Sequence, residues 1–175
     1  MPPPPAARTP SCPRDRFQEV GAAHTHIRGP EALARYLAEG ASGAVWLEDH
    51  ALVKSAIREL SKRGLEAHLA QDSWPSEVDL AVTVGLGAIP ELGSVLAAPK
   101  KWPGAWLPFR ARRHVVVIPP QHSELTLAEA LHFTAAQDPG LVTWLTGPTR
   151  TTDIEKVLVL GAQGPAELDI VVYNP

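Results

Sequence analysis

Two hydrophobic patterns alternate along the first half of this 175-residue chain. Residues 29–40 and 49–64 carry apolar side chains three or four positions apart, which predicts amphipathic helices that each end at a glycine. Short apolar runs at 43–49 and 65–70 predict strands that alternate with these helices. Such alternation is typical of an α/β domain.

The second half of the chain is richer in predicted strands. One helix is expected at 126–137, where Thr126 and Glu129 have the spacing of a capping box. Apolar or β-branched runs predict further strands at 78–89, 93–98, 114–120, 141–147, 156–162 and 167–174. We therefore expect an α/β fold with a mixed, largely parallel sheet flanked by helices.

Composition limits the class of protein. Residues 1–20 are rich in proline and lack the apolar core of a signal peptide, so we expect a disordered arm followed by one domain at 21–175. No apolar run approaches the roughly 20 residues that span a bilayer, and the net charge of -3 gives no general attraction to nucleic acid or membranes. Cys12 is the only cysteine, which excludes an internal disulfide and fits a reducing cytoplasm. A homo-oligomer is compatible with the sequence.

The stretch TWLTGPTRTTDIEKVLVLGAQGP, residues 143–165, concentrates hydroxyl groups, an arginine and two acids between apolar runs. Thr152 and Glu155 have capping-box spacing, which predicts a short helix that begins after the carboxyl end of a strand. Ligands of open α/β sheets collect at such places, and Arg150 supplies a planar fork for a carboxylate or phosphate. Spacing alone favours a simpler interpretation, in which a threonine caps the helix and Arg150 pairs with Asp153 or Glu155.

A turn that contains glycine, VGLGAIPELGS, overlaps the end of the predicted strand at 78–89. Its glycines lack the G-x-G-x-x-G spacing of a dinucleotide fingerprint. The turn still permits a ligand to approach the backbone, where Glu91 would be a candidate acid, base or nucleophile. Spacing alone favours a tight connection with a solvated glutamate.

Basic and aromatic residues are interleaved between Lys100 and His114, with Trp102, Trp106 and Phe109 among them. This mixture resembles the composition of single-stranded nucleic-acid sites. The prolines within it and the acidic total favour a solvated loop or a lid that contacts a partner protein. The seven histidines of the chain lack the spacing of metal ligands, so we predict no metal site.

The segment TGPTRTTDIEKVLVLGAQGPAELDIVV resembles the C-terminal signature of the LUD-domain family, of the lactate-utilisation protein C type. That signature reads approximately T-G-P-S-R-T-A-D-I-E, an apolar strand, then G-x-H-G-P and a final strand. The matching positions are Thr146, Gly147, Pro148, Arg150, Thr151, Asp153, Ile154, Glu155, Gly161, Gly164 and Pro165. Upstream, Glu91, Gly93 and Ser94 match the family's A-E-T-G-S/T turn, with Leu92 in place of threonine. Gln163 stands where many members have histidine.

The resemblance implies a fold similar to the NagB/RpiA/CoA-transferase-like group. It also implies a role in oxidising L-lactate to pyruvate together with partner proteins, one of which carries iron–sulfur clusters. We therefore expect no cofactor in this chain, an iron–sulfur protein and other subunits as partners, and a small carboxylate or phosphate as ligand. Whether the chain itself performs chemistry stays open.

Spacing and resemblance together give a hypothesis for the site, in which the ligand lies between two turns. Arg150 would clamp the anion, and Glu91 would be the only nearby group suited to acid, base or nucleophilic chemistry. The predicted site residues are Glu91, Gly93, Ser94, Thr149, Arg150, Thr151, Asp153, Glu155 and Gln163. One alternative is a non-catalytic assembly or regulatory protein that docks its partner through the Trp102–Phe109 loop. Another is an acyl- or CoA-transfer enzyme that uses Glu91.

Overall fold

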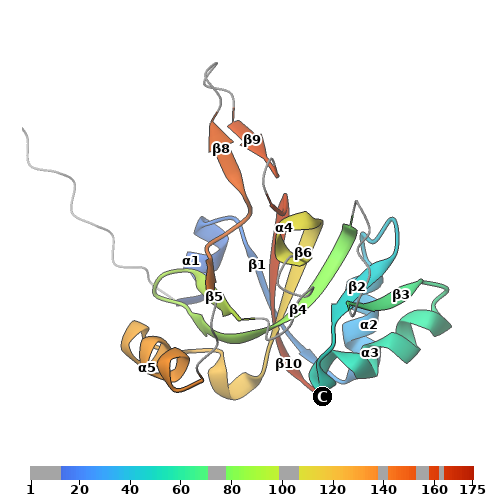
Figure 1. Cartoon of the computed structure of the whole chain (residues 1–175), viewed down its shortest axis with the longest axis horizontal. Helices are drawn as coiled ribbons and strands as arrows, with labels where there is room; N and C mark the ends of the chain where they lie inside the picture. The colour runs from blue at the N-terminus through green and yellow to red at the C-terminus, as the bar shows by residue number, and fades with distance from the viewer. Residues whose placement is uncertain (1–12, 71–77, 99–106, 138–141, 153–157, 162–163) are drawn as a thin grey trace, which may run out of the picture.

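The computed structural model of the chain describes residues 13–70, 78–98, 107–137, 142–152, 158–161 and 164–175 (Figure 1). These residues form a mixed α/β fold with one eight-stranded sheet and a separate two-stranded hairpin, which confirms the predicted fold class. The predictions made for Cys12, Trp102, Trp106, Asp153, Glu155 and Gln163 lie outside the described residues.

Helices and strands alternate through the first part of the chain and strands dominate its end. The described helices are α1 (Pro13–Glu19), α2 (Pro30–Ala38), α3 (Ala51–Lys62), α4 (Leu107–Arg110), the 3-10 helix η2 (Pro120–His122) and α5 (Leu127–Gln137). The described strands are β1 (Ala23–Arg28), β2 (Val45–Glu48), β3 (Ala67–Ala70), β4 (Val78–Ile89), β5 (Ser94–Ala97), β6 (Ala111–Ile118), β7 (Thr143–Leu145), β8 (Arg150–Thr152), β9 (Leu158–Leu160) and β10 (Glu167–Asn174).

Six strands of the sheet are parallel, in the order β1-β10-β6-β4-β2-β3. Strand β4 then continues past an irregularity between Gly85 and Gly87 and pairs with β5 in the antiparallel direction. A side chain at Gly85 would place its Cβ 2.8 Å from Cγ1 of Val116, so glycine is required where the strand turns away. Strand β7 extends this second arm by pairing with β5.

Helices α2 and α3 cover one face of the parallel sheet (Figure 1). Leu33 and Leu37 of α2 are fully buried, as are Ala56 and Leu60 of α3, which confirms the apolar faces predicted from the sequence. Gly64 ends α3 with a positive φ of 76°. None of the described helices has the length and apolar character needed to cross a membrane.

Helix α1 packs against the opposite face of the sheet, so residues 13–19 of the segment predicted as a disordered arm are helical, whereas residues 1–12 lie outside the described residues. Phe17 of α1 is fully buried in a cluster with Val95, Ile118 and Ile170. Proline-rich composition concealed this helix because its burial depends on one phenylalanine. Strand β1, which the sequence analysis also missed, is an edge strand whose polar and apolar residues do not alternate regularly.

Helix α5 begins as predicted but buries a different residue from those expected of an apolar face. The capping box is present, because Glu129 Oε2 accepts a hydrogen bond from Thr126 N at 2.8 Å and Glu129 N donates to Thr126 Oγ1 at 3.2 Å. Ala130 is fully buried, whereas Leu127 and Leu131 are exposed. The helix therefore contacts the β4 extension and β5 through Ala130, which packs with Ile89 and Leu96.

Strands β8 and β9 pair with each other outside the main sheet. Residues Arg150–Thr152 pair in the antiparallel direction with Leu158–Leu160. In Figure 1 the two strands project from the edge of the sheet at which β6 and β10 begin. Arg150–Thr152 were expected to form a turn and instead form a strand, as hydroxyl and β-branched residues allow. The short helix that was predicted to follow Thr152 lies outside the described residues.

Candidate functional site

The turn at 91–94 contacts Thr146, a signature residue that precedes the predicted turn at 149–153. The hydroxyl groups of Ser94 and Thr146 lie 2.6 Å apart. Gly93, next to this contact, has a φ of 63°, and a Cβ there would lie 2.8 Å from the carbonyl oxygen of Arg16 in α1. The turn at 91–94 is therefore packed closely against α1.

Arg150 binds the backbone of the α1–β1 connection. Its Nη2 donates a hydrogen bond to the carbonyl oxygen of Val20 at 2.9 Å. Gly147 approaches the same carbonyl so closely that a Cβ on this residue would overlap it. In this arrangement the guanidinium of Arg150 stabilises the connection, a contact that the sequence analysis did not predict.

Glu91 likewise has a partner within the fold. Its Oε1 accepts a hydrogen bond from Leu127 N at 3.1 Å, at the first residue of α5. A carboxylate near a helix N-terminus is stabilised by the free N–H groups and by the helix dipole. Glu91 and Arg150 are thus held by different elements, and neither lines the large pocket described below.

Thr149 joins the two halves of the signature. Its N–H donates to the carbonyl oxygen of Pro165 at 2.8 Å, and its carbonyl oxygen accepts from Gly161 N at 3.0 Å. A Cβ on Gly164 would lie 2.3 Å from the Thr149 hydroxyl oxygen, so a larger residue there would displace that hydroxyl. Thr151 belongs to β8 and pairs with Val159. These contacts fix the loop that leads into β10.

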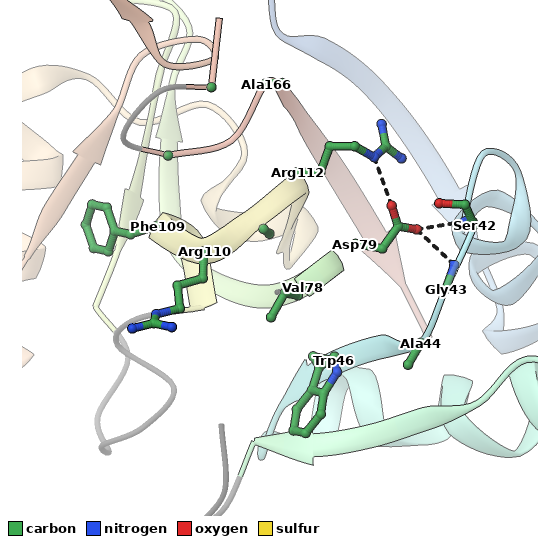
Figure 2. Close-up of a pocket in the computed structure, with 13 residues that line it drawn as sticks. Ser42, Gly43, Ala44, Trp46, Val78, Asp79, Phe109, Arg110, Arg112 and Ala166 are labelled. Carbon is green, nitrogen blue, oxygen red and sulfur yellow. Dashed lines mark hydrogen bonds and ion pairs between the residues drawn. The ribbon is translucent and has the colours of Figure 1, made fainter. Parts of the chain in front are cut away.

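That loop forms one wall of a pocket of about 730 Å³ at the amino edge of the parallel sheet (Figure 2). Other walls come from segments that enter the central strands, with Ser42 and Gly43 before β2, Asp79 in β4, Arg112 in β6 and Ala166 before β10. Because these strands are parallel, their first residues lie along one edge of the sheet. The pocket therefore joins residues that are far apart in the sequence.

An ion pair between Asp79 and Arg112 organises one side of this pocket. Arg112 Nε donates to Asp79 Oδ1 at 2.8 Å, and Asp79 Oδ2 accepts from Ser42 N at 2.7 Å and from Gly43 N at 3.2 Å. Burial alone raises the pKa of Asp79, but the hydrogen bonds from Arg112 and Ser42 outweigh burial and leave the pKa below its usual value. Arg112 also donates to Glu167 at 2.6 Å, so two carboxylates compensate its charge.

The opposite side of the pocket is formed by α4. Figure 2 shows Phe109 and Arg110 across from Asp79, Ser42 and Gly43. The Arg110 side chain is exposed, and within the described parts of the chain no hydrogen bond or ion pair occupies its guanidinium. Among the described lining residues, Arg112 is neutralised within the fold and Arg110 is available to a ligand.

The amino edge is not where open α/β sheets usually bind ligands, since such sites are generally at the carboxyl ends of the strands. The carboxyl edge has a smaller pocket of about 390 Å³, lined in part by His26, Arg28, Ser123 and Asn174. The larger pocket forms at the other edge because the β8–β9 hairpin is inserted immediately before β10 and carries the signature glycines there.

Several pocket residues were missed by the sequence analysis. Asp79 and Arg112 are charged residues at the second positions of buried strands, and this shared position was the available signal. Arg110 and Phe109 were noticed only as members of a basic, aromatic stretch. Finding the pocket required the parallel pairing of β4 with β6, which aligns Leu80 with Arg113 and so places Asp79 beside Arg112.

Metal chemistry has no support among the described residues, where no group of three or more His, Cys, Asp or Glu side chains has a metal-binding arrangement. His114 is fully buried between β4 and β6, with its Nε2 2.8 Å from the hydroxyl of Thr83. Burial lowers the pKa of His114 to about 3. This histidine is therefore uncharged and contributes no cation to the nearby pocket.

Comparison with known proteins places this geometry in a family. Residues 75–173 match the LUD domain. The chain belongs to the LUD-domain family. It is 28% identical over 165 residues to lactate utilization protein C of Anoxybacillus flavithermus (strain DSM 21510 / WK1). The aligned region covers 92% of this chain and 70% of that protein. The match includes both signature glycines that line the amino-edge pocket.

The LUD-domain fold is also found in a solved structure. A crystal structure of a DUF162 family protein from Deinococcus radiodurans has a TM-score of 0.67 to this chain and 19% sequence identity. The alignment covers 92% of this chain and 93% of that one. At this level of identity the likeness shows the fold alone.

Proposed function

We propose that this LUD-domain chain is a component of a lactate-utilisation system and binds a small anionic ligand in the amino-edge pocket. Membership of the LUD-domain family and similarity to a protein named lactate utilization protein C support the role. The observation that carries the location is that Gly161 and Gly164 of the signature line the same pocket as the exposed Arg110. A conformationally fixed loop and an available cation are what an anion site requires.

Arg110 is the residue that we assign to the anion. Among the charged lining residues, Asp79 and Arg112 compensate each other, which leaves one positive charge. A guanidinium suits this role because its planar donors match the two oxygens of a carboxylate or phosphate. Arg112 would then orient the pocket wall through Asp79, Ser42 and Gly43 without contacting the ligand directly.

The turns at Glu91–Ser94 and Thr149–Thr152 support the pocket in this proposal. Thr149 fixes the signature loop, and Arg150 fixes the connection between α1 and β1. A direct contact between Arg150 and a ligand would require it to release the Val20 carbonyl. That contact stays a prediction, which the variants below also test.

We further propose that the chain works in the cytoplasm with an iron–sulfur protein and other subunits of the lactate-oxidation system. Oxidation of lactate to pyruvate releases two electrons, and a four-cysteine cluster is not available in a chain whose only cysteine is Cys12. Size-exclusion chromatography of the chain with the reconstituted iron–sulfur subunit of the same system tests this part. Co-elution with the visible absorbance of the cluster is the expected result, and separate elution of both proteins at micromolar concentration would contradict it.

A thermal-shift titration tests the anion site. The panel is L-lactate, pyruvate, other 2-hydroxy acids and phosphate, applied to the wild type, Arg110→Ala and Arg150→Ala. A ligand at 100 times its Kd adds about 2.7 kcal/mol to the free energy of unfolding. For a domain of this size that corresponds to a rise in Tm of about 5–11 °C.

The expected result is that at least one anion stabilises the wild type and Arg150→Ala but not Arg110→Ala. Arg58→Ala, which removes an exposed arginine on α3, is the matched control for the loss of one positive charge. If the anion raised the Tm of Arg110→Ala but not that of Arg150→Ala, the site would lie at the turns Glu91–Ser94 and Thr149–Thr152 instead. No shift with any anion would refute the proposed anion site.

A further inference from the structure

The amino-edge pocket is larger than a simple hydroxy acid needs. Its volume of about 730 Å³ lies in the range of roughly 300–1,000 Å³ that is usual for sites of cofactors and drug-sized ligands. At about 30 Å³ for each water-sized group, it has room for roughly two dozen such groups. A three-carbon acid would occupy only a small part of this space.

Small residues make up much of the pocket surface. Of the thirteen lining residues that the structure describes, six are glycine or alanine, namely Gly43, Ala44, Ala111, Gly161, Gly164 and Ala166. Such residues present backbone and methyl groups, so a flat ligand can approach the chain closely. Two of these positions cannot carry a larger side chain cheaply, since a Cβ at Gly161 would lie 3.1 Å from Cβ of Ala166 and one at Gly164 would overlap Thr149. Small residues at these positions of the signature loop thus keep its backbone open to a ligand.

Two aromatic side chains border these small residues. Trp46 comes from β2 and Phe109 from α4, and Figure 2 shows them on different sides of the pocket. The Trp46 ring is fixed by stacking on His68, with ring centroids 4.7 Å apart. Aromatic side chains next to accessible backbone favour a planar ring, because stacking on an aromatic side chain stabilises a bound base by about 1–3 kcal/mol.

We infer that this pocket binds a planar heteroaromatic ring that carries one anionic group, of about the size of a mononucleotide. The ring lies along the small residues between Trp46 and Phe109, and the anionic group binds Arg110. The inference rests on the proposed anion site at Arg110 and adds the chemical class of the ligand. It also implies that lactate itself is too small to be the main ligand of this pocket.

Isothermal titration calorimetry with three related compounds tests the inference on the full chain. AMP has both the ring and the anionic group, adenosine has the ring alone, and ribose 5-phosphate has the anionic group alone. We expect AMP to bind at least about tenfold more tightly than either part, since a charge-assisted hydrogen bond contributes roughly 1.5–3 kcal/mol. Equal affinity for AMP and ribose 5-phosphate would overturn the ring, while leaving the anion site of the proposed function intact.

Two variants separate the contributions of ring and anion. Arg110→Ala is expected to weaken AMP about tenfold and to leave adenosine unchanged. Ala44→Leu, which places a branched side chain on the pocket surface, is expected to weaken AMP and adenosine and to leave ribose 5-phosphate unchanged. Arg58→Ala is again the control with unchanged affinities. If adenosine bound as tightly as AMP, the anion site would be overturned and the ring would be kept. If none of the three compounds bound, both would be overturned.

A second measurement does not depend on how well Ala44→Leu folds. A stacked ring shifts the NMR signals of nearby methyl groups upfield, so AMP added to the wild type should move the methyl signals of Ala44 and Ala166. The methyl signal of Ala56, which is buried on the face of α3 that packs on the sheet, should stay in place. Unchanged Ala44 and Ala166 signals at a saturating AMP concentration would overturn the inference.

Discussion

Gly93 tests whether the turn at 91–94 is fixed by its contact with α1. Gly93 has a φ of 63°, and a Cβ there would lie 2.8 Å from the carbonyl oxygen and 3.2 Å from the carbonyl carbon of Arg16. Gly64 provides a matched control, because its φ is 76° and a Cβ there would meet nothing within 4 Å. Gly93→Ala and Gly64→Ala therefore share the conformational cost and differ in the overlap.

The two costs can be estimated separately. Placing alanine in the left-handed region costs about 1–2 kcal/mol in either variant. The overlap at Gly93 is with backbone atoms, which cannot rotate away, and forcing extra atoms into a packed site costs about 1–3 kcal/mol. Gly93→Ala should therefore lose about 1–3 kcal/mol more stability than Gly64→Ala, which corresponds to a Tm lower by about 2–12 °C for a domain of this length.

Thermal unfolding followed by circular dichroism measures this difference, and amide hydrogen exchange locates it. Exchange of the α1 amides should be faster in Gly93→Ala and unchanged in Gly64→Ala, because only the first substitution displaces α1. Equal Tm values for the two variants, or α1 amides that stay protected in Gly93→Ala, would refute the packing of this turn on α1.

Three further predictions concern charged and titratable groups. Asp79→Asn should lower the free energy of unfolding, measured with urea, by about 1–2 kcal/mol, because it removes the charge that strengthens the hydrogen bonds to Arg112, Ser42 and Gly43. The loss is no larger because the Arg112 side chain is nearly half exposed and water screens the ion pair. Hydrogen bonds from Thr126 lower the pKa of Glu129. The ionised Glu129 carboxylate therefore stabilises α5 above the usual pKa of glutamate, and this stabilisation is lost as the pH falls below it. Glu129→Gln should abolish the acid dependence of amide exchange in α5. Burial lowers the pKa of His114 to about 3. As the pH falls, this imidazole is protonated in the unfolded chain before it is protonated in the folded chain. The free energy of unfolding should therefore fall by up to about 1.4 kcal/mol for each pH unit below about 6.5. His114→Gln should remove that dependence in urea unfolding measured from pH 7 to 4.

The regular elements of the fold were predictable where local pattern and packing agree. Leu33 and Leu37 share a helix face because of their spacing, and α2 packs that face on the sheet. Strand β6 was visible as a β-branched run because it is buried on both faces. Helix α1 was not, since its packing depends on one buried side chain, Phe17, in a segment whose composition is typical of disorder.

The candidate site was less predictable because it depends on strand order. The signature residues Arg150 and Thr149 were identified correctly as unusual, but the contacts that they make are with Val20 and Pro165. Neither contact follows from spacing, since each joins a separate element of the chain. The capping pattern at Thr152 could not reveal that Arg150–Thr152 form a strand, because the antiparallel partner, Leu158–Leu160, is not part of that pattern.

One NMR titration tests most directly whether the amino-edge pocket is the ligand site of this LUD-domain protein. Amide chemical shifts of the labelled chain would be recorded as the anion that raises the Tm most is added. The account predicts that the largest changes occur at Ser42, Gly43, Gly161 and Gly164, which line the pocket. Changes centred on the turn at 91–94, or on the carboxyl-edge pocket at His26–Arg28, would contradict it.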